Sequence, residues 1–138
     1  MGRWIALDVG TKRTGIAETD PLKIIASGLT TVSTPELIPF LKDYHQRETL
    51  EIIVVGEPKR LHGEASDIES FIGPLLLEIK ENLPGIPIAR VDERFTSKMA
   101  FQSLIDSGVK KSKRREKSLV DEVSATLILQ SYMSSEAM

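Results

Sequence analysis

The chain has 138 residues, of which 41% are hydrophobic and 28% charged, and this composition predicts one soluble globular domain over residues 1–138. The absence of cysteine and the presence of only two histidines exclude a disulfide scaffold, a zinc–thiolate site, a cysteine nucleophile and a histidine-rich metal site. No apolar run approaches the roughly 20 residues of a membrane span, and a strand pattern begins close after Met1, so we expect a cytoplasmic protein without a signal peptide or membrane contact.

Short apolar segments separated by turn residues predict three strands at the start of the chain. The expected strands are Trp4–Val9, Thr14–Thr19 and Ile24–Val32. A helix should follow, with Ser33 or Thr34 as its N-terminal cap and Pro35 in its first turn. Its apolar residues recur at helical spacing, at Leu37, Phe40, Leu41 and Tyr44.

The remainder of the chain alternates between strands and helices. The β-branched run Leu50–Val55 predicts a central parallel strand, and Ile86–Val91 predicts another strand. Further helices are expected over Ala65–Asn82, Ser97–Ser107 and Leu119–Met133. The order β-β-β-α-β-α-β-α-α predicts an α/β fold in which helices cover both faces of a mixed five-stranded sheet.

A basic strip precedes the last expected helix. Residues 110–117 contain six basic residues and one acid, a net charge of +5, so the rest of the chain, from a total of −2, carries −7. Because local potential matters more to a polyanion than total charge, we favour a phosphate clamp over a solvated surface loop. The expected phosphate contacts are Lys110, Lys111, Lys113, Arg114 and Arg115. Aromatic side chains make up only 5%, which predicts little base stacking and weak sequence readout.

Acids stand at three places where a strand or helix would otherwise carry apolar residues. Asp8 ends the first strand, Asp92 and Glu93 end another, and Asp121 lies toward the core side of the last helix. Strand ends converge at one edge of a sheet, so these acids predict an all-oxygen site for Mg²⁺ or Mn²⁺. Two such ions support phosphodiester hydrolysis by a metal-bound water. The alternative is structural: Asp8 opens a turn, and Asp121 is a negative charge near the start of its helix that the helix dipole stabilises.

The turn DVGTKRTG places phosphate-binding groups beside the first of these acids. Thr11, Lys12 and Arg13 supply a hydroxyl and two positive charges, and the glycines leave backbone N–H groups accessible. Similar turns occur in sugar-kinase and actin-like ATPases, but those need two lobes, and 138 residues supply one. The alternative is a tight hairpin with a solvated basic tip.

Four ordered segments resemble the YqgF (RuvX) family, a minimal branch of the ribonuclease H-like, Holliday-junction-resolvase-like nucleases. They are DVGTKRTGIA (Asp8–Ala17), VVGEPK (Val54–Lys59), VDERFTS (Val91–Ser97) and VDEVSATLILQSY (Val120–Tyr132). The resemblance spans nearly the whole chain and implies an RNase H-like fold and a divalent-metal nuclease. It further implies trimming of the 5′ end of precursor 16S ribosomal RNA, and an older family assignment is resolution of Holliday junctions.

The resemblance also implies roles for the acids. Asp8 matches the catalytic aspartate of the first strand, Asp121 matches the acid of the last helix, and Asp92 and Glu93 belong to the strand-end D-E-R motif. Because neighbouring strand residues point to opposite faces, only one of that pair can be a ligand. We favour Asp8, Glu93 and Asp121 as metal ligands, with Asp92 as a supporting catalytic residue.

Two further positions bear on the site. Arg94 of the D-E-R motif is expected, like Arg13, to contact phosphate. Glu57 replaces the apolar residue usual in the family's V-G-x-P motif, and is either a fourth acid of the site or a solvated turn residue.

The leading hypothesis is a nuclease for structured RNA. The alternatives are a resolvase of DNA junctions, which requires a homodimer, and a catalytically silent nucleic-acid-binding module; the sequence leaves monomer and homodimer open.

Overall fold

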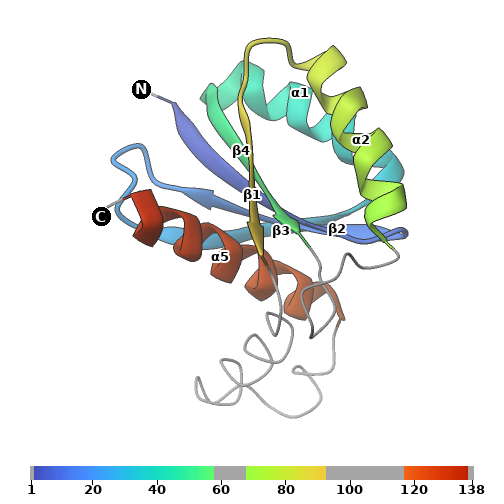
Figure 1. Cartoon of the computed structure of the whole chain (residues 1–138). Helices are drawn as coiled ribbons and strands as arrows, with labels where there is room; N and C mark the ends of the chain where they lie inside the picture. Colours follow the sequence, from blue (N-terminus) through green and yellow to red (C-terminus); the bar gives the residue numbers. More distant parts are fainter. Residues whose placement is uncertain (1, 58–67, 93–116, 137–138) are drawn as a thin grey trace.

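The computed structural model describes residues 2–57, 68–92 and 117–136, with the side chains of the last segment from residue 120 onward. Within these residues, five strands form one mixed sheet with helices on both faces, which confirms the predicted fold class (Figure 1). The helix expected over residues 97–107 lies outside the described residues. None of the helices in these ranges is both long and apolar enough to cross a membrane.

The first three strands form an antiparallel meander, as expected from their turn residues. They are β1 (Arg3–Val9), β2 (Arg13–Thr19) and β3 (Ala26–Ser33). The β1–β2 turn is closed by a hydrogen bond in which the Gly10 N–H donates to the Arg13 carbonyl at 3.0 Å. A Cβ at position 10 would lie 2.7 Å from that oxygen, so this tight turn requires glycine.

The later elements extend the sheet on the other side of β1. In chain order they are η1 (Thr34–Glu36), α1 (Leu37–Glu48), β4 (Leu50–Glu57), α2 (Glu69–Asn82), β5 (Ile88–Asp92) and α5 (Lys117–Glu136). β4 pairs in parallel with both β1 and β5, and the strand order is β3-β2-β1-β4-β5. Because β1, β4 and β5 run in the same direction, their carboxyl ends meet at one edge of the sheet.

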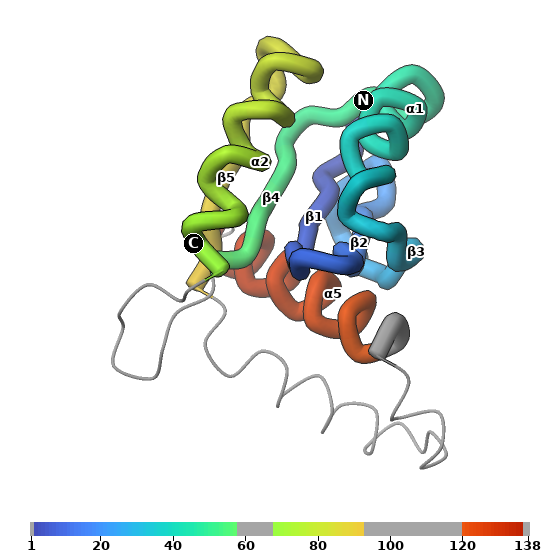
Figure 2. Tube along the Cα trace, turned by 90° about the vertical axis from the view of Figure 1, so that its right-hand side faces the viewer, coloured from blue at the N-terminus to red at the C-terminus, as the bar shows by residue number. Residues whose placement is uncertain are grey.

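The sheet has a core on each face. Ile5, Leu7 and Val9 of β1 belong to the core formed with α1 and α2. Ala6 belongs to the core formed with α5, whose buried members are Ala6, Ala17, Val54, Ala125, Ile128 and Leu129. Figure 2 shows α5 on the opposite side of the sheet from α1 and α2. Since strand residues alternate, the face that holds Ala6 also holds Asp8.

The strand expected from Ile24 begins at Ala26 instead. The Asp20 carboxylate accepts hydrogen bonds from the backbone N–H groups of Leu22 at 3.2 Å, and of Ile24 and Ile25 at 2.7 Å each. These bonds, that of Ile25 foremost, lower the pKa of Asp20 and keep the segment in a turn. These three apolar residues are 63% to 68% exposed. A prediction based on hydrophobicity alone therefore starts the strand too early.

The predicted helix cap is confirmed in its position but not in its hydrogen bond: Ser33 stands at the N-cap of η1, with Pro35 in the first turn. Ser33 precedes a 3₁₀ turn, and its side chain makes no capping hydrogen bond. The Thr34 hydroxyl instead donates to the Gly10 carbonyl at 2.6 Å and lies 3.0 Å from the Thr14 hydroxyl. Thr34 therefore connects the start of α1 to the β1–β2 turn, an interaction between segments that a local capping rule does not consider.

Candidate functional site

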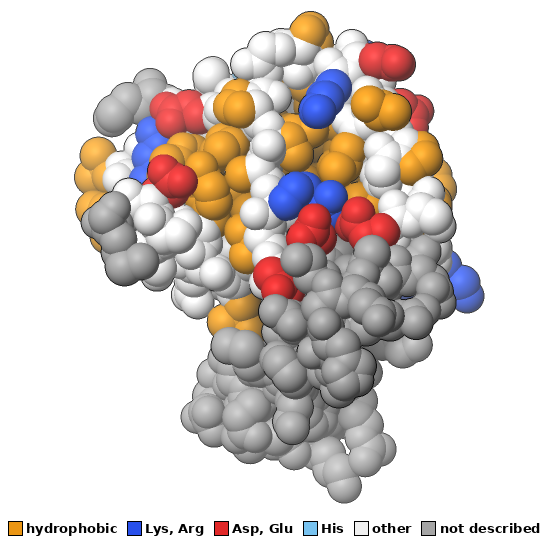
Figure 3. Space-filling view, viewed as in Figure 1, with side chains coloured by type: hydrophobic (Ala, Val, Ile, Leu, Met, Phe, Trp, Pro, Cys, Tyr) orange, Lys and Arg blue, Asp and Glu red, His pale blue; other side chains and the backbone are white. Residues whose placement is uncertain are grey.

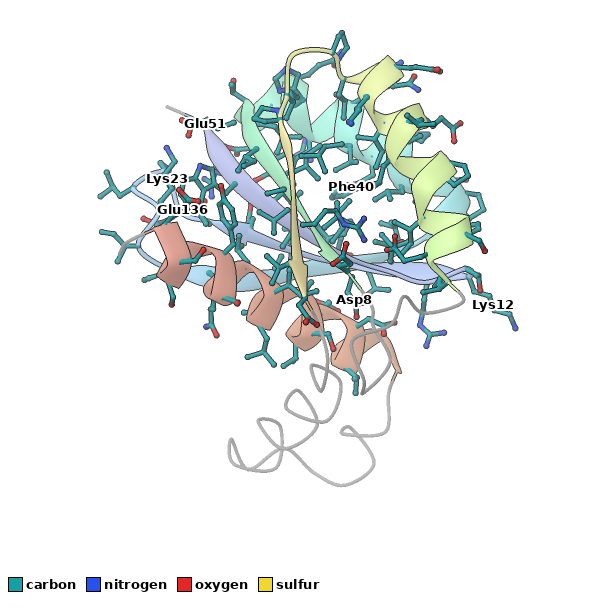
Figure 4. The ribbon with its side chains drawn as sticks, viewed as in Figure 1. Asp8, Lys12, Lys23, Phe40, Glu51 and Glu136 are labelled. Carbon is teal, nitrogen blue, oxygen red and sulfur yellow. The ribbon has the colours of Figure 1, made fainter. Side chains whose placement is uncertain are left out.

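A pocket of about 350 Å³ lies where the β1–β2 turn meets α5. It is lined by Asp8, Val9, Gly10, Thr11, Lys12, Arg13 and Asp121. In Figure 4, Asp8 lies at the end of the sheet next to α5, and Lys12 lies at the outer tip of the turn. The fold thus brings five of the expected site residues to one place: Asp8, Thr11, Lys12, Arg13 and Asp121.

Gly15 explains why the two acids lie close together. In the register of β1 and β2, Gly15 is paired with Asp8. A Cβ on Gly15 would lie 2.1 Å from the Asp121 carbonyl oxygen and 2.9 Å from the Asp121 Cβ. The backbone of α5 therefore rests directly on β2 beside Asp8. Sequence reasoning included Gly15 only as part of the turn motif, although a glycine inside a strand is itself a signal of close backbone approach.

An ion pair joins the turn to α5 inside this pocket. Arg13 Nε lies 2.6 Å from Asp121 Oδ2, and the two side chains are 36% and 23% exposed. The residues are 108 positions apart in the sequence. Partial burial reduces solvent screening of the pair, so the guanidinium offsets part of the Asp121 charge.

The neighbouring acid on α5, Glu122, points away from the pocket. Its Cβ lies 3.4 Å from where a Cβ on Gly28 of β3 would be. Burial raises the pKa of the Glu122 carboxyl, a side-chain hydrogen bond with Thr31 opposes that rise, and the negative charge of Asp121 adds to it. Among the described residues, the lining of the pocket therefore includes Asp121 but not Glu122.

Asp92 and Glu57 lie on the opposite face of the sheet from Asp8. They are paired with each other in the register of β4 and β5. Val55, two residues before Glu57, belongs to the core under α1 and α2, whereas Val91, one residue before Asp92, packs against the core under α5. Strand alternation then places both acids on the α1 and α2 side. The structure does not bring either of them into the pocket that Asp8 lines.

Arg90 joins the ends of β4 and α2, a role that sequence reasoning missed. Its guanidinium donates to the carbonyls of Val55 at 3.3 Å and Gly56 at 3.0 Å. It also forms an ion pair with Glu69 in the first turn of α2. Both side chains are about three-quarters buried, at 25% and 23% exposure. The available signal was an arginine two residues before Asp92 in an otherwise apolar strand.

A larger pocket, of about 580 Å³, lies between α1 and α2 and differs in chemistry. Its walls include Ile38, Phe71, Pro74 and Leu75, and Thr11 stands at its junction with the smaller pocket. Among the described residues, the acid in its lining is Glu78. Volume alone does not identify a catalytic site, and the smaller pocket is the one lined by the carboxylates of Asp8 and Asp121 and by the basic turn.

The other expected site residues lie outside the described residues. They are Glu93, Arg94, Lys110, Lys111, Lys113, Arg114 and Arg115. In the described ranges, no group of three or more His, Cys, Asp or Glu residues is placed to hold a metal ion. Asp8 and Asp121 nevertheless supply two carboxylates to one pocket, which is the donor chemistry that Mg²⁺ and Mn²⁺ prefer. Figure 3 shows charged side chains spread over this face of the molecule, with one group of acidic side chains beside a basic patch near the lower edge of the described surface.

Comparison with known proteins identifies similar sequences. The model of the RuvX family, described as "Holliday junction resolvase", matches residues 2–135. A protein of Christiangramia forsetii is 60% identical over 133 residues, covering 96% of this chain and 98% of that protein. One of Flavobacterium psychrophilum is 53% identical over 134 residues, covering 97% and 98%. Both are named "Putative pre-16S rRNA nuclease".

Solved structures with little sequence identity share the fold. A fowlpox virus resolvase in complex with Holliday junction DNA aligns with a TM-score of 0.60 at 10% identity, covering 99% of each chain. Thermus thermophilus RuvC with a Holliday junction substrate aligns with a TM-score of 0.56 at 14% identity, covering 99% of this chain and 96% of that one. At these identities the likeness concerns architecture alone, and it confirms the predicted RNase H-like fold.

Proposed function

The chain belongs to the RuvX family, and on that premise we propose that it is a divalent-metal-dependent nuclease that processes the 5′ end of precursor 16S ribosomal RNA. Relatives that are 51% to 60% identical over nearly their full length carry the name of a pre-16S rRNA nuclease. The observation that supports the proposal most directly is that Asp8 and Asp121 line the same pocket beside a basic turn.

The residues of this pocket fit a divalent cation. Asp121 already holds a positive group, the Arg13 guanidinium, at 2.6 Å, and Asp8 lines the same space. We assign Asp8 and Asp121 as ligands. When bound, a divalent cation supplies Lewis-acid chemistry, which polarises a phosphate and lowers the pKa of water.

Glu93 is the third proposed ligand. Asp92 lies on the α1 and α2 side of the sheet, so alternation along a continuing strand would direct the next residue toward the side of Asp8. This register supports the choice of Glu93 over Asp92, for which we propose a supporting role. The same register gives no support to Glu57 as a ligand.

Basic residues around the pocket are the proposed phosphate contacts. Lys12 and Arg13 belong to the pocket itself, and Thr11 adds a hydroxyl at its edge. We extend the proposal to Arg94 and to the strip Lys110, Lys111, Lys113, Arg114 and Arg115. Binding through these groups should weaken as salt is raised, because it releases counterions from the nucleic acid.

A cleavage assay tests the site. Purified wild-type protein, Asp8→Asn and Asp121→Asn are incubated with Mg²⁺ or Mn²⁺ and a 16S RNA precursor that carries its 5′ extension. Each variant should lose roughly 100-fold or more in rate, because several kcal/mol of transition-state stabilisation depend on the cation. Asp43→Asn is the matched control, since Asp43 is 64% exposed and pairs with Arg47 on α1. Undiminished cleavage by both site variants would refute the assignment.

Resolution of DNA junctions is the second candidate, favoured by the description of the family and by the resolvase architecture. A four-way DNA junction therefore belongs in the same assay. Faster cleavage of the junction than of the RNA, together with a dimer in solution, would replace the RNA proposal. Binding of either substrate without cleavage in any metal would indicate a catalytically silent binding module.

A further inference from the structure

Arg13 forms an ion pair with Asp121, which is itself a proposed metal ligand. Its Nε contacts Oδ2 of Asp121 at 2.6 Å, and both side chains line the pocket that contains Asp8. A divalent cation held by Asp121 needs the same carboxylate. Since two cations against one carboxylate repel each other, the guanidinium and the metal ion compete for this position.

The backbone of Arg13 is held in place, whereas its side chain has room to move. The Arg13 carbonyl accepts the Gly10 N–H, and Arg13 is paired with Ser33 across the β2–β3 ladder. The Lys12 carbonyl accepts the Thr34 N–H at 3.0 Å. The side chain itself is more than one-third exposed at the edge of the pocket. Release from Asp121 thus requires a change of rotamer and leaves the turn intact.

We propose that Arg13 is the resident counter-ion of Asp121, that a divalent cation displaces it, and that the released guanidinium binds a phosphate of the nucleic acid. The inference rests on the proposed metal site. A guanidinium binds phosphate through parallel N–H donors, and Arg13 needs only to turn within a pocket of about 350 Å³. Phosphate and metal then each weaken the same ion pair.

This arrangement couples the two ligands thermodynamically. A phosphate that attracts Arg13 exposes Asp121 and raises its affinity for metal. By linkage, the metal raises the affinity for phosphate by the same factor. The free protein therefore holds metal weakly, and the complete site assembles on the substrate.

Calorimetric titration with Mn²⁺ in the absence of nucleic acid tests the competition. Arg13→Gln should bind Mn²⁺ about two- to fivefold more tightly than wild type, the factor that corresponds to a partly exposed ion pair. Lys12→Gln is the matched control: it removes the same charge from the same turn, and within the described residues Lys12 has no ion pair. The increase in Mn²⁺ affinity caused by Arg13→Gln must exceed any increase caused by Lys12→Gln.

A second titration tests the coupling. In the presence of a saturating phosphorothioate-substituted RNA that resists cleavage, wild type should gain Mn²⁺ affinity, and Arg13→Gln should gain less. Equal or weaker Mn²⁺ binding by Arg13→Gln without RNA would overturn the inference, as would an equal RNA-dependent gain in both proteins.

The failure of the metal site itself gives a different result. If Asp121→Asn binds Mn²⁺ as well as wild type, or if no protein binds it even with the RNA present, the proposed metal site is wrong, and the inference falls with it. If Asp121→Asn loses binding while Arg13→Gln and wild type bind equally, the metal site stands and only the counter-ion role is refuted. Melting curves for every variant confirm that each is folded.

Discussion

Replacement of Gly15 by alanine should force α5 away from the sheet and separate the two acids of the pocket. The added Cβ would lie 2.1 Å from the Asp121 carbonyl oxygen and 2.4 Å from its carbonyl carbon. An ordinary contact begins at 3.4 Å, so the helix backbone has to recede by about 1.3 Å. Because the obstacle is backbone, no side-chain rotation can relieve it.

The expected cost follows from overpacking of a core. Such insertions destabilise proteins by about 1–3 kcal/mol. For a domain of this size, roughly 3 °C of melting temperature is lost per kcal/mol, so Gly15→Ala should melt about 3–9 °C below wild type. Under the proposed function, Mn²⁺ affinity should fall as well, since Asp8 and Asp121 no longer face one pocket.

Thermal denaturation followed by circular dichroism, together with Mn²⁺ titration, measures both effects. Gly73→Ala is the control, because a Cβ at that position of α2 meets nothing within 4 Å. Its effect on stability should stay within about 1 kcal/mol, because helix propensity favours alanine whereas Pro74, the next residue, disfavours a Cβ in helical conformation at this position. If Gly15→Ala has the same melting temperature as wild type and binds Mn²⁺ equally well, the close approach of α5 to β2 is refuted.

Three further substitutions test the fold around the site. Arg90→Gln should destabilise the protein by about 1–3 kcal/mol in urea denaturation, because Glu69 and two strand carbonyls lose their donor; a cost under about 0.5 kcal/mol would contradict this role. The pKa of Asp20 is lowered by backbone hydrogen bonds, so its contribution is present above the ordinary value of 3.8 and disappears as pH falls through the lowered value. The melting temperature of Asp20→Asn should therefore fall less steeply than that of wild type in acid, and parallel curves would argue against the Asx-type turn. Leu129→Ala, in the core under α5, should cost about 2–5 kcal/mol, whereas Leu77→Ala, at a position 62% exposed, should change stability by no more than about 0.5 kcal/mol; equal costs would refute the burial of α5.

Two errors of the sequence reasoning have a common physical cause. The hydrophobicity of Ile24 and Ile25 predicts a strand, but the Asp20 carboxylate holds them in an exposed turn. The position of Thr34 before Pro35 predicts a helix cap, but its hydroxyl donates to the Gly10 carbonyl instead. In both cases a polar side chain found a partner that local propensity does not weigh.

The sequence by itself determined the order of the elements and the types of residue that the site uses. Apolar periodicity is a local property, so it identified the five strands, the parallel position of β4 and the inward face of α5. The acids Asp8 and Asp121 stood out because a charge among apolar neighbours is costly without a partner.

Only the tertiary structure decided which of these residues meet. The register of β4 and β5 directs Asp92 to the side of the sheet away from Asp8. The close packing of α5 on Gly15 brings Asp121 to the β1–β2 turn, where Arg13 binds it. These choices depend on strand register and on the distance between helix and sheet, which are settled by packing between residues as far as 108 positions apart.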